Sequence, residues 1–164
     1  MRESKAPHWA LWLSVSAGLV LVDQLVKLLI RQKLASPQPV HVTPFFDLVL
    51  VYNPGAAFSL LSTASGWQRE LFIGIALAAS VLILYLLRKY AEQRLFCLGL
   101  SLILAGAIGN LLDRVQFGAV VDFLHFHIGE YYFPAFNVAD SAITCGAGLL
   151  IWDGLWRSQA RSTG

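Results

Sequence analysis

The chain has 164 residues, of which 57% are hydrophobic and only 13% are charged. Soluble domains carry about 25% charged residues, so this composition indicates a membrane protein. The formal net charge of +2, with no long run of basic residues, argues against a nucleic-acid partner. The length suits one compact bundle without a linker, and a single domain over residues 1–164 is expected.

Four stretches have the length and composition of membrane spans. A bilayer core about 30 Å thick requires roughly 20 mostly apolar residues in an α-helix. The stretches cover about residues 8–30, 71–87, 95–112 and 137–156. The first is preceded by basic residues, as in a signal peptide, but its apolar run is too long for one, and it is interpreted as a retained anchor. The predicted fold is therefore an all-α membrane protein with four transmembrane helices.

The basic residues that flank these stretches predict the orientation, because cytoplasmic flanks carry an excess of Lys and Arg. With a cytoplasmic amino terminus, seven of these residues lie inside: Arg2, Lys5, Arg88, Lys89, Arg94, Arg157 and Arg161. Four lie outside: Arg31, Lys33, Arg69 and Arg114. This bias predicts that both termini are cytoplasmic.

The two outer loops contain β-like segments. Phe46 to Tyr52 is rich in β-branched and aromatic residues, and Asn53-Pro54-Gly55 follows as a turn. Residues 56–61 are expected to form a short amphipathic helix at the interface and to act as a lid. Ala119 to Val121 and Tyr131 to Phe133 add further short strands between the third and fourth spans. Together the loops are expected to cap the helices outside the cytoplasm.

Several charged residues lie where they are costly. A charged side chain at membrane depth costs about 2.5–3.5 kcal/mol to insert. Asp23 and Lys27 are four apart on one helix face and can form an ion pair, which is interpreted as structural. Gly106 and Gly109 permit close packing at the end of the third span. Three polar residues follow there and are expected to form a functional cluster: Asn110, Asp113 and Arg114.

Asp122 and Asp140 are the candidate catalytic pair. Asp122 lies in the second outer loop among apolar residues, and Asp140 lies about one turn into the fourth span, so both are expected at the outer interface. If two carboxyl groups meet there, repulsion and desolvation keep one protonated. The neutral member can then donate to a scissile carbonyl while the ionised member takes a proton from water. The alternative for each residue alone is a helix cap or a satisfied loop acid.

Two other classes of function remain open from the residues. His125 and His127 would share a face on a strand, and Asp122 or Glu130 could complete a metal site, which would make a metal-dependent hydrolase. A lone HxH is weak evidence for a metal. A proton-coupled transporter subunit is the second alternative, but a relay needs acids throughout the membrane depth. Here the acids cluster at one face, which argues against transport.

Five short motifs follow one another along the chain. They are Asp23-Gln24-x-x-Lys27, Asn53-x-Gly55-x-x-Phe58, Gly109-Asn110-x-x-Asp113-Arg114, Val121-Asp122-Phe123 and Phe136-Asn137-x-Ala139-Asp140-Ser141. Each is a weak signal alone, but in this order and spacing they resemble lipoprotein signal peptidase, also called signal peptidase II. The resemblance covers the chain from about Asp23 to Ile143.

The resemblance implies four transmembrane helices with a small extracytoplasmic β-rich cradle. It implies an aspartyl endopeptidase of the bacterial inner membrane, without cofactor or metal, whose active site faces the periplasm. The implied substrate is a prolipoprotein that carries a diacylglyceryl group on a cysteine and is cleaved before that cysteine. The implied partners are this substrate and membrane lipids, and the enzyme is expected to act as a monomer.

The resemblance also assigns roles to individual residues. The catalytic pair is Asp122 and Asp140. The residues expected to hold the substrate or orient the pair are Asn53, Gly55, Asn110, Arg114 and Asn137. Asp113 is expected to fix Arg114 or a loop, and Asp23 with Lys27 is expected to shape the outer edge of the site.

Overall fold

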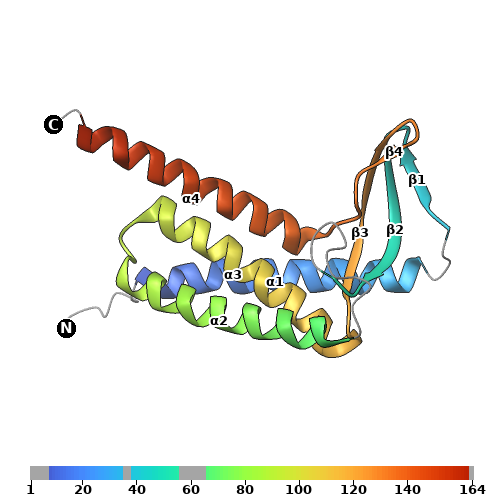
Figure 1. The fold of residues 1–164 in the computed structure, drawn as a ribbon, viewed down its shortest axis with the longest axis horizontal. Helices are drawn as coiled ribbons and strands as arrows, with labels where there is room; N and C mark the ends of the chain where they lie inside the picture. The colour runs from blue at the N-terminus through green and yellow to red at the C-terminus, as the bar shows by residue number, and fades with distance from the viewer. Residues whose placement is uncertain (1–7, 35–37, 56–65, 163–164) are drawn as a thin grey trace, which may run out of the picture.

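The computed structural model describes residues 8–34, 38–55 and 66–162. In these ranges the chain forms four long helices and one small antiparallel sheet (Figure 1). The helices are α1 (His8–Lys33), α2 (Trp67–Lys89), α3 (Arg94–Phe117) and α4 (Val138–Ser162). The strands are β1 (Val40–Thr43), β2 (Phe46–Asn53), β3 (Val120–Ile128) and β4 (Tyr131–Tyr132). The predicted fold class is confirmed, while the short interfacial helix predicted for residues 56–61 lies outside the described residues.

Each of the four helices is long and apolar enough to cross a membrane, with mean hydropathies of 1.8, 2.4, 2.2 and 1.2 in chain order. The helices extend beyond the predicted apolar stretches. Helix α3 continues five residues past Leu112, through Asp113 and Arg114, and ends at Phe117, followed by Gly118 with φ 76°. The backbone hydrogen bonds of α3 continue beyond its apolar stretch, and the helix stops where Gly118 adopts the left-handed conformation. The polar cluster therefore lies within α3 rather than at its end.

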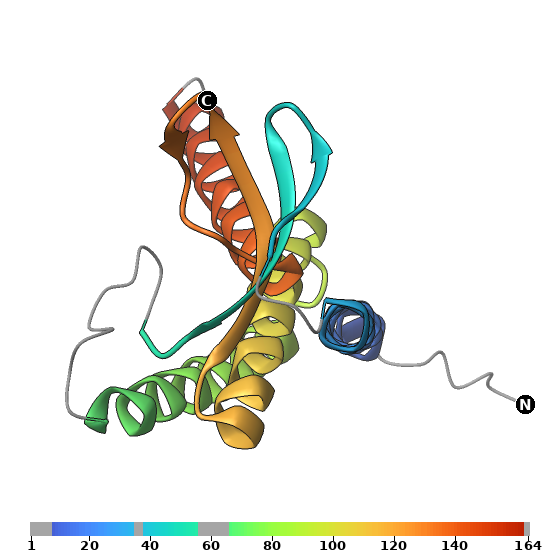
Figure 2. The ribbon, with the colours of Figure 1, turned by 90° about the vertical axis from the view of Figure 1, so that its right-hand side faces the viewer.

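Helix α3 is the centre of the bundle and packs against α1, α2 and α4. Helices α2 and α4 both rest on α3 but diverge from each other (Figure 2). Glycines bring α3 and α4 into close contact: a Cβ added to Gly146 would lie 2.6 Å from Gly99 O, and one added to Gly106 would overlap Ala139 O. Small residues at such crossings let two backbones approach.

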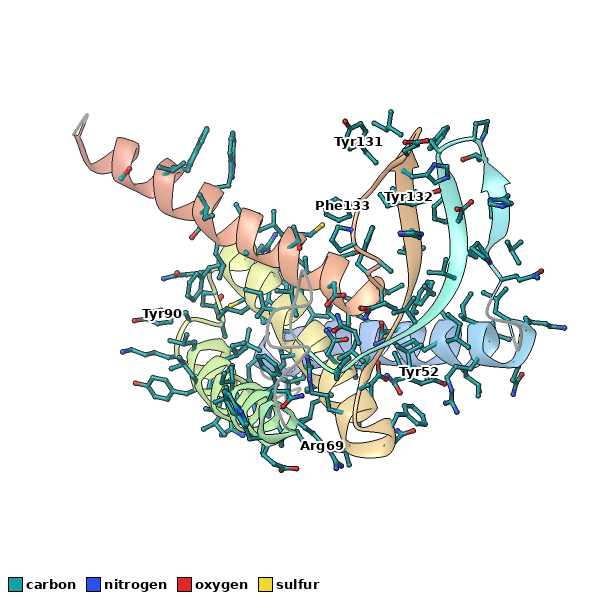
Figure 3. The ribbon with its side chains drawn as sticks, turned by 45° about the vertical axis from the view of Figure 1, so that its right-hand side comes forward. Tyr52, Arg69, Tyr90, Tyr131, Tyr132 and Phe133 are labelled. Carbon is teal, nitrogen blue, oxygen red and sulfur yellow. The ribbon has the colours of Figure 1, made fainter. Side chains whose placement is uncertain are left out.

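The sheet lies at one end of the bundle, across the helix axes (Figure 1). Its strand order is β1-β2-β3-β4, and all pairs are antiparallel. The β2–β3 register places Val51 opposite Asp122 and Asn53 opposite Val120. Strand β4 carries the exposed Tyr131 and Tyr132 (Figure 3). Strand β1 was not predicted, although its β-branched residues followed by Pro44 are typical of a strand and a turn.

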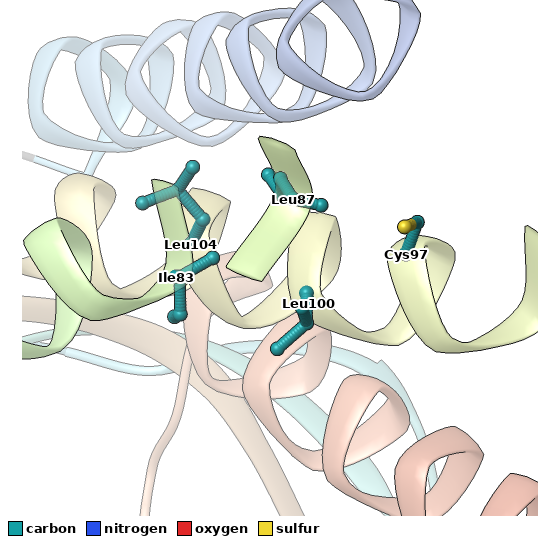
Figure 4. Close-up of a cluster of buried hydrophobic side chains, with 5 residues drawn as sticks. All are labelled: Ile83, Leu87, Cys97, Leu100 and Leu104. Atoms are coloured by element: carbon teal, nitrogen blue, oxygen red, sulfur yellow. The ribbon is translucent and has the colours of Figure 1, made fainter. Parts of the chain in front are cut away.

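The apolar core lies at the opposite end, where α2 ends and α3 begins (Figure 4). Its buried members are Ile83, Leu87, Cys97, Leu100 and Leu104. Nonpolar packing therefore joins these helices far from the sheet, whereas polar contacts dominate near it. Most of the buried polar side chains that could act in a reaction therefore gather at the end of the bundle next to the sheet.

Candidate active site

The structure brings the two candidate catalytic carboxyl groups to one cavity. Asp122 extends from β3 and Asp140 from the first turn of α4, and both line a cavity of about 650 Å³. Asn137 hydrogen-bonds to both residues: its Nδ2 donates to Asp122 Oδ1 (2.7 Å), and its Oδ1 accepts from the Asp140 backbone N–H (2.9 Å). Two segments that approach from different directions are thus joined by one buried amide.

Asp140 is oriented by the start of its own helix. Asn137 precedes the first residue of α4, and its backbone N–H donates to Asp140 Oδ2 (3.3 Å). With the bond from the Asp140 N–H to Asn137 Oδ1, this is a reciprocal capping box. The cap interpretation of Asp140 is therefore observed, and it leaves Oδ1 to accept from Asn110 Nδ2 (2.7 Å). The same residue serves the helix and faces the cavity.

Asp122 is buried and receives amide hydrogen bonds on both oxygens. Asn53 Nδ2 donates to its Oδ2 (3.2 Å), and Asn137 Nδ2 donates to its Oδ1. Burial raises the pKa of Asp122 to about 7, and the negative charge of Asp140 adds to this rise, against the opposing effect of the two amide donors and of Lys27. A carboxyl group that holds its proton near neutral pH is unusual, and such groups concentrate at functional sites.

A buried ion cluster lies beside this pair. Lys27 Nζ lies 2.8 Å from Asp23 Oδ2 and 2.7 Å from Asp113 Oδ2, which confirms the predicted pairing of Asp23 with Lys27. Asp23 Oδ1 accepts from Ala139 N on α4 (2.8 Å), and Asp113 Oδ2 accepts from Val121 N on β3 (3.1 Å). Asp113 thus fixes the start of β3, within the second outer loop, which is one of its two predicted roles. The cluster ties α1, α3, α4 and β3 together at the level of the cavity.

Gln24 belongs to the same cluster but was not singled out from the sequence. Its Nε2 donates to Asp113 Oδ1 (2.9 Å) and to Gly109 O (3.2 Å). Its position beside Asp23, within the first of the five motifs, was the available signal. A polar amide inside an apolar helix needs partners, and here it finds them on α3.

Arg114 lines the cavity and joins α3 to the turn after β2. Its Nη2 donates to Gly55 O (2.9 Å), and its guanidinium lies 4.9 Å from the ring centre of Phe72. Gly55 N donates in turn to Asn53 Oδ1 (3.0 Å), so the turn after β2 is held against the site. Arg69 covers the end of α3, because its Nε donates to Arg114 O (3.0 Å).

The cavity combines a polar floor with apolar walls. The floor contains the two carboxyl groups, Asn53, Asn110 and Arg114. The apolar walls come from α2 and α4, which diverge from each other: Phe72, Ile75, Ala76, Ala79, Ile143 and Cys145. Phe133 and Phe136 close the side next to the sheet. Such a site can take a ligand with one polar centre and long apolar parts.

The histidines of β3 lie away from the two carboxyl groups. His125 and His127 share a face, as predicted, and each ring stacks on Tyr132 with 5.1 Å between centroids. His41 Nδ1 lies 2.7 Å from Asp47 Oδ1, and this contact lowers the pKa of Asp47. Within residues 8–34, 38–55 and 66–162, no three His, Cys, Asp or Glu side chains are grouped so that they could hold a metal ion.

Known proteins resemble this chain over most of its length. The profile of the signal peptidase (SPase) II family matches residues 15–156. A lipoprotein signal peptidase of Burkholderia vietnamiensis is 56% identical over 146 residues, which are 89% of this chain and 88% of the relative. One from Janthinobacterium sp. (strain Marseille) is 54% identical over the same shares.

A solved structure gives the same result for the fold. The structure of a bacterial membrane enzyme, determined by the in meso method at 2.3 Å resolution, superposes with a TM-score of 0.81. It is 32% identical in sequence, and the match covers 91% of this chain and 90% of that chain. None of these relatives supports the transporter alternative. This chain belongs to the signal peptidase II family.

Proposed function

We propose that this protein is an aspartyl endopeptidase that removes the signal peptide from diacylglyceryl-modified prolipoproteins, cleaving before the lipidated cysteine. Membership of the signal peptidase II family supports the reaction. The observation that carries the aspartyl mechanism is the joining of Asp122 and Asp140 through Asn137 at one cavity.

The two carboxyl groups share the work of hydrolysis. The ionised member takes a proton from a water molecule, whose oxygen attacks the carbonyl carbon of the scissile peptide bond. The neutral member donates its proton to the carbonyl oxygen. Collapse of the tetrahedral intermediate breaks the C–N bond: the amine of the lipidated cysteine leaves with a proton from the pair, and one hydroxyl of the intermediate returns a proton to the pair as the new carboxyl group forms. The pair titrates as a unit, so neither residue alone is assigned the proton.

The surroundings of the cavity suit a substrate that stays in the membrane. The polar floor lies at the end of the helices, beside the sheet, while the apolar walls continue down α2 and α4. Acyl chains can lie against these walls, with bilayer lipids as neighbours, while the peptide bond reaches the carboxyl groups. The sheet lies at the end opposite the start of α1 and the end of α4, which agrees with cytoplasmic termini and a periplasmic site. One chain supplies every group in this scheme, so a monomer is the proposed active form.

A cleavage assay in detergent tests this proposal. The purified protein is expected to cleave a diacylglyceryl-modified prolipoprotein and to leave the unmodified precursor intact, and a chelator is expected to have no effect. The fragments are identified by mass spectrometry, which locates the bond that breaks. Equal cleavage of both substrates would contradict lipid selectivity. Loss of activity with the chelator would favour the metal-dependent alternative on His125 and His127.

The activity is expected to fall as pH rises above neutrality. The reaction needs one proton on the pair, and the pKa of Asp122 is raised to about 7 from its usual 3.8. Because the pair loses its shared proton near and above this value, kcat/KM should fall about tenfold per pH unit on the alkaline side. Initial rates between pH 5 and pH 9 check this. A flat profile above pH 7 would contradict a shared proton.

A further inference from the structure

We propose that Lys27 is a positioning residue. It fixes the orientation of the Asn110 side-chain amide, so that the NH₂ group and not the oxygen faces Asp140. The inference rests on the proposed function, since it assigns Asp140 to the reaction. It goes further because Lys27 touches neither Asp122 nor Asp140 through any hydrogen bond or ion pair found in the described residues. Besides the effect of its charge on Asp122, its hydrogen-bonded route to the pair runs through Asn110.

The ammonium group of Lys27 has three N–H donors and no acceptor. Each donor has an acceptor: Asp23 Oδ2 at 2.8 Å, Asp113 Oδ2 at 2.7 Å and Asn110 Oδ1 at 3.2 Å. The side chain is buried, with 2% of its surface exposed, so water does not replace any of these partners. Asn110 must therefore turn its oxygen toward Lys27, because the ammonium can only donate.

The opposite end of the Asn110 amide then points to the reaction site. The Nδ2 of Asn110 donates to Asp140 Oδ1 at 2.7 Å. The Oδ1 of Asn110 accepts a second hydrogen bond, from Asn137 Nδ2 at 3.2 Å. If the amide turned over, its NH₂ group would face two donors, and its oxygen would face the carboxylate of Asp140. Both contacts would be repulsive. The orientation of this one side chain thus follows from a cation on α1.

The two asparagines form a chain of directed hydrogen bonds from Lys27 to both carboxyl groups. Asn110 donates to Asp140, and Asn137 donates both to Asn110 and to Asp122 at 2.7 Å. Carboxyl groups that share a proton need fixed donors, because misplacement by about 1 Å can cost 10²-fold in rate. Asp23 and Asp113 hold the cation, and their other contacts anchor α4 and β3. The two acids thus hold the backbone beside each carboxyl group, while Lys27 reaches the carboxyl group of Asp140 through the Asn110 amide.

A double-mutant cycle on kcat tests this inference. Lys27→Met alone is expected to lower kcat about 10²-fold with little change in KM, since the substrate still binds while the carboxyl group is misplaced. In an Asn110→Ala background the same substitution should change kcat less than about threefold, because the route through the amide is already gone. Fully multiplicative effects, or an unchanged kcat in Lys27→Met, would overturn the inference.

Two further variants keep the result interpretable. Lys27→Met leaves two buried acids without their cation and can prevent folding, so the cycle is repeated in an Asp23→Asn background, where one negative charge is removed with the positive one. Ser16→Ala is the matched control: it removes a buried hydrogen bond between the same two helices outside the cluster, from Ser16 Oγ to Ser101 O (2.9 Å), and should lower the unfolding temperature but not kcat.

The proposed function is judged separately in the same assay. If the parental protein does not cleave lipidated substrate, the proposed function fails. If it does, and the effects of Lys27→Met and Asn110→Ala multiply, only the role of Lys27 is overturned.

Discussion

Asp122→Asn and Asp140→Asn are each expected to lower kcat about 10³-fold in cleavage of lipidated prolipoprotein, within the range that acid–base catalysis contributes. Asparagine keeps the size of aspartate and can still accept hydrogen bonds through its oxygen. It cannot carry the proton that the pair must hold and release. The measurement is single-turnover cleavage in detergent with enzyme in excess, which isolates chemistry from product release.

The chain offers matched controls for both substitutions. Asp47 is buried on β2, the strand paired with the one that carries Asp122, and Asp153 is buried on the same helix as Asp140. Asp47→Asn and Asp153→Asn should retain parental kcat, even if they unfold at lower temperature. Near-parental cleavage by either Asp122→Asn or Asp140→Asn would show that the catalytic assignment is wrong.

Gly106→Ala is expected to destabilise the protein by about 3 kcal/mol, the upper end of the usual cost of overpacking, and to abolish cleavage. The added Cβ would overlap the backbone oxygen of Ala139 and approach Ile143 Cγ1. A backbone atom cannot turn aside as a flexible side chain can, so the start of α4 must move away from α3. Asn137 and Asp140 would move with it. Thermal unfolding in detergent and the cleavage assay check the two effects.

Gly148→Ala is the control for this prediction. Gly148 lies on α4, and a Cβ added there would meet no atom within 4 Å. Alanine also favours helix over glycine by about 1 kcal/mol. This variant should therefore be at least as stable as the parent and fully active. If Gly106→Ala behaved in the same way, the close packing of α3 against α4 would not be needed.

Much of the fold follows from local sequence. Apolar runs predicted all four helices, because membrane spans require continuous nonpolar length. Their ends were less accurate: α2 begins at Trp67 rather than near Leu71, since the first turn carries charged residues that hydropathy excludes. Strand β1 was missed because four residues give little alternation to detect. Its pairing with β2 depends on the partner strand.

The sequence indicated which residues belong to the candidate site, but not most of the contacts between them. Motifs of the sequence pointed to Asp122 and Asp140, and the spacing of Asp23 and Lys27 predicted their contact. The contact between Lys27 and Asp113 could not be predicted, because it depends on how α1 packs against α3. The two contacts of the Asn137 side chain, with Asp122 and with the Asp140 backbone, could likewise be predicted only in part. The run from Asn137 to Asp140 has the spacing of a capping box, but nothing local indicates that the same amide also reaches β3.

The capping box at the start of α4 has a consequence for biosynthesis. Asn137 and Asp140, at the start of α4, leave the ribosome after Asp122, Asn110 and Lys27. A nascent chain that has inserted only α1, α2 and α3 lacks one member of the proposed catalytic pair and the amide that links it to the other member. On the proposed mechanism, proteolytic competence therefore arises in one step, when α4 enters the bilayer.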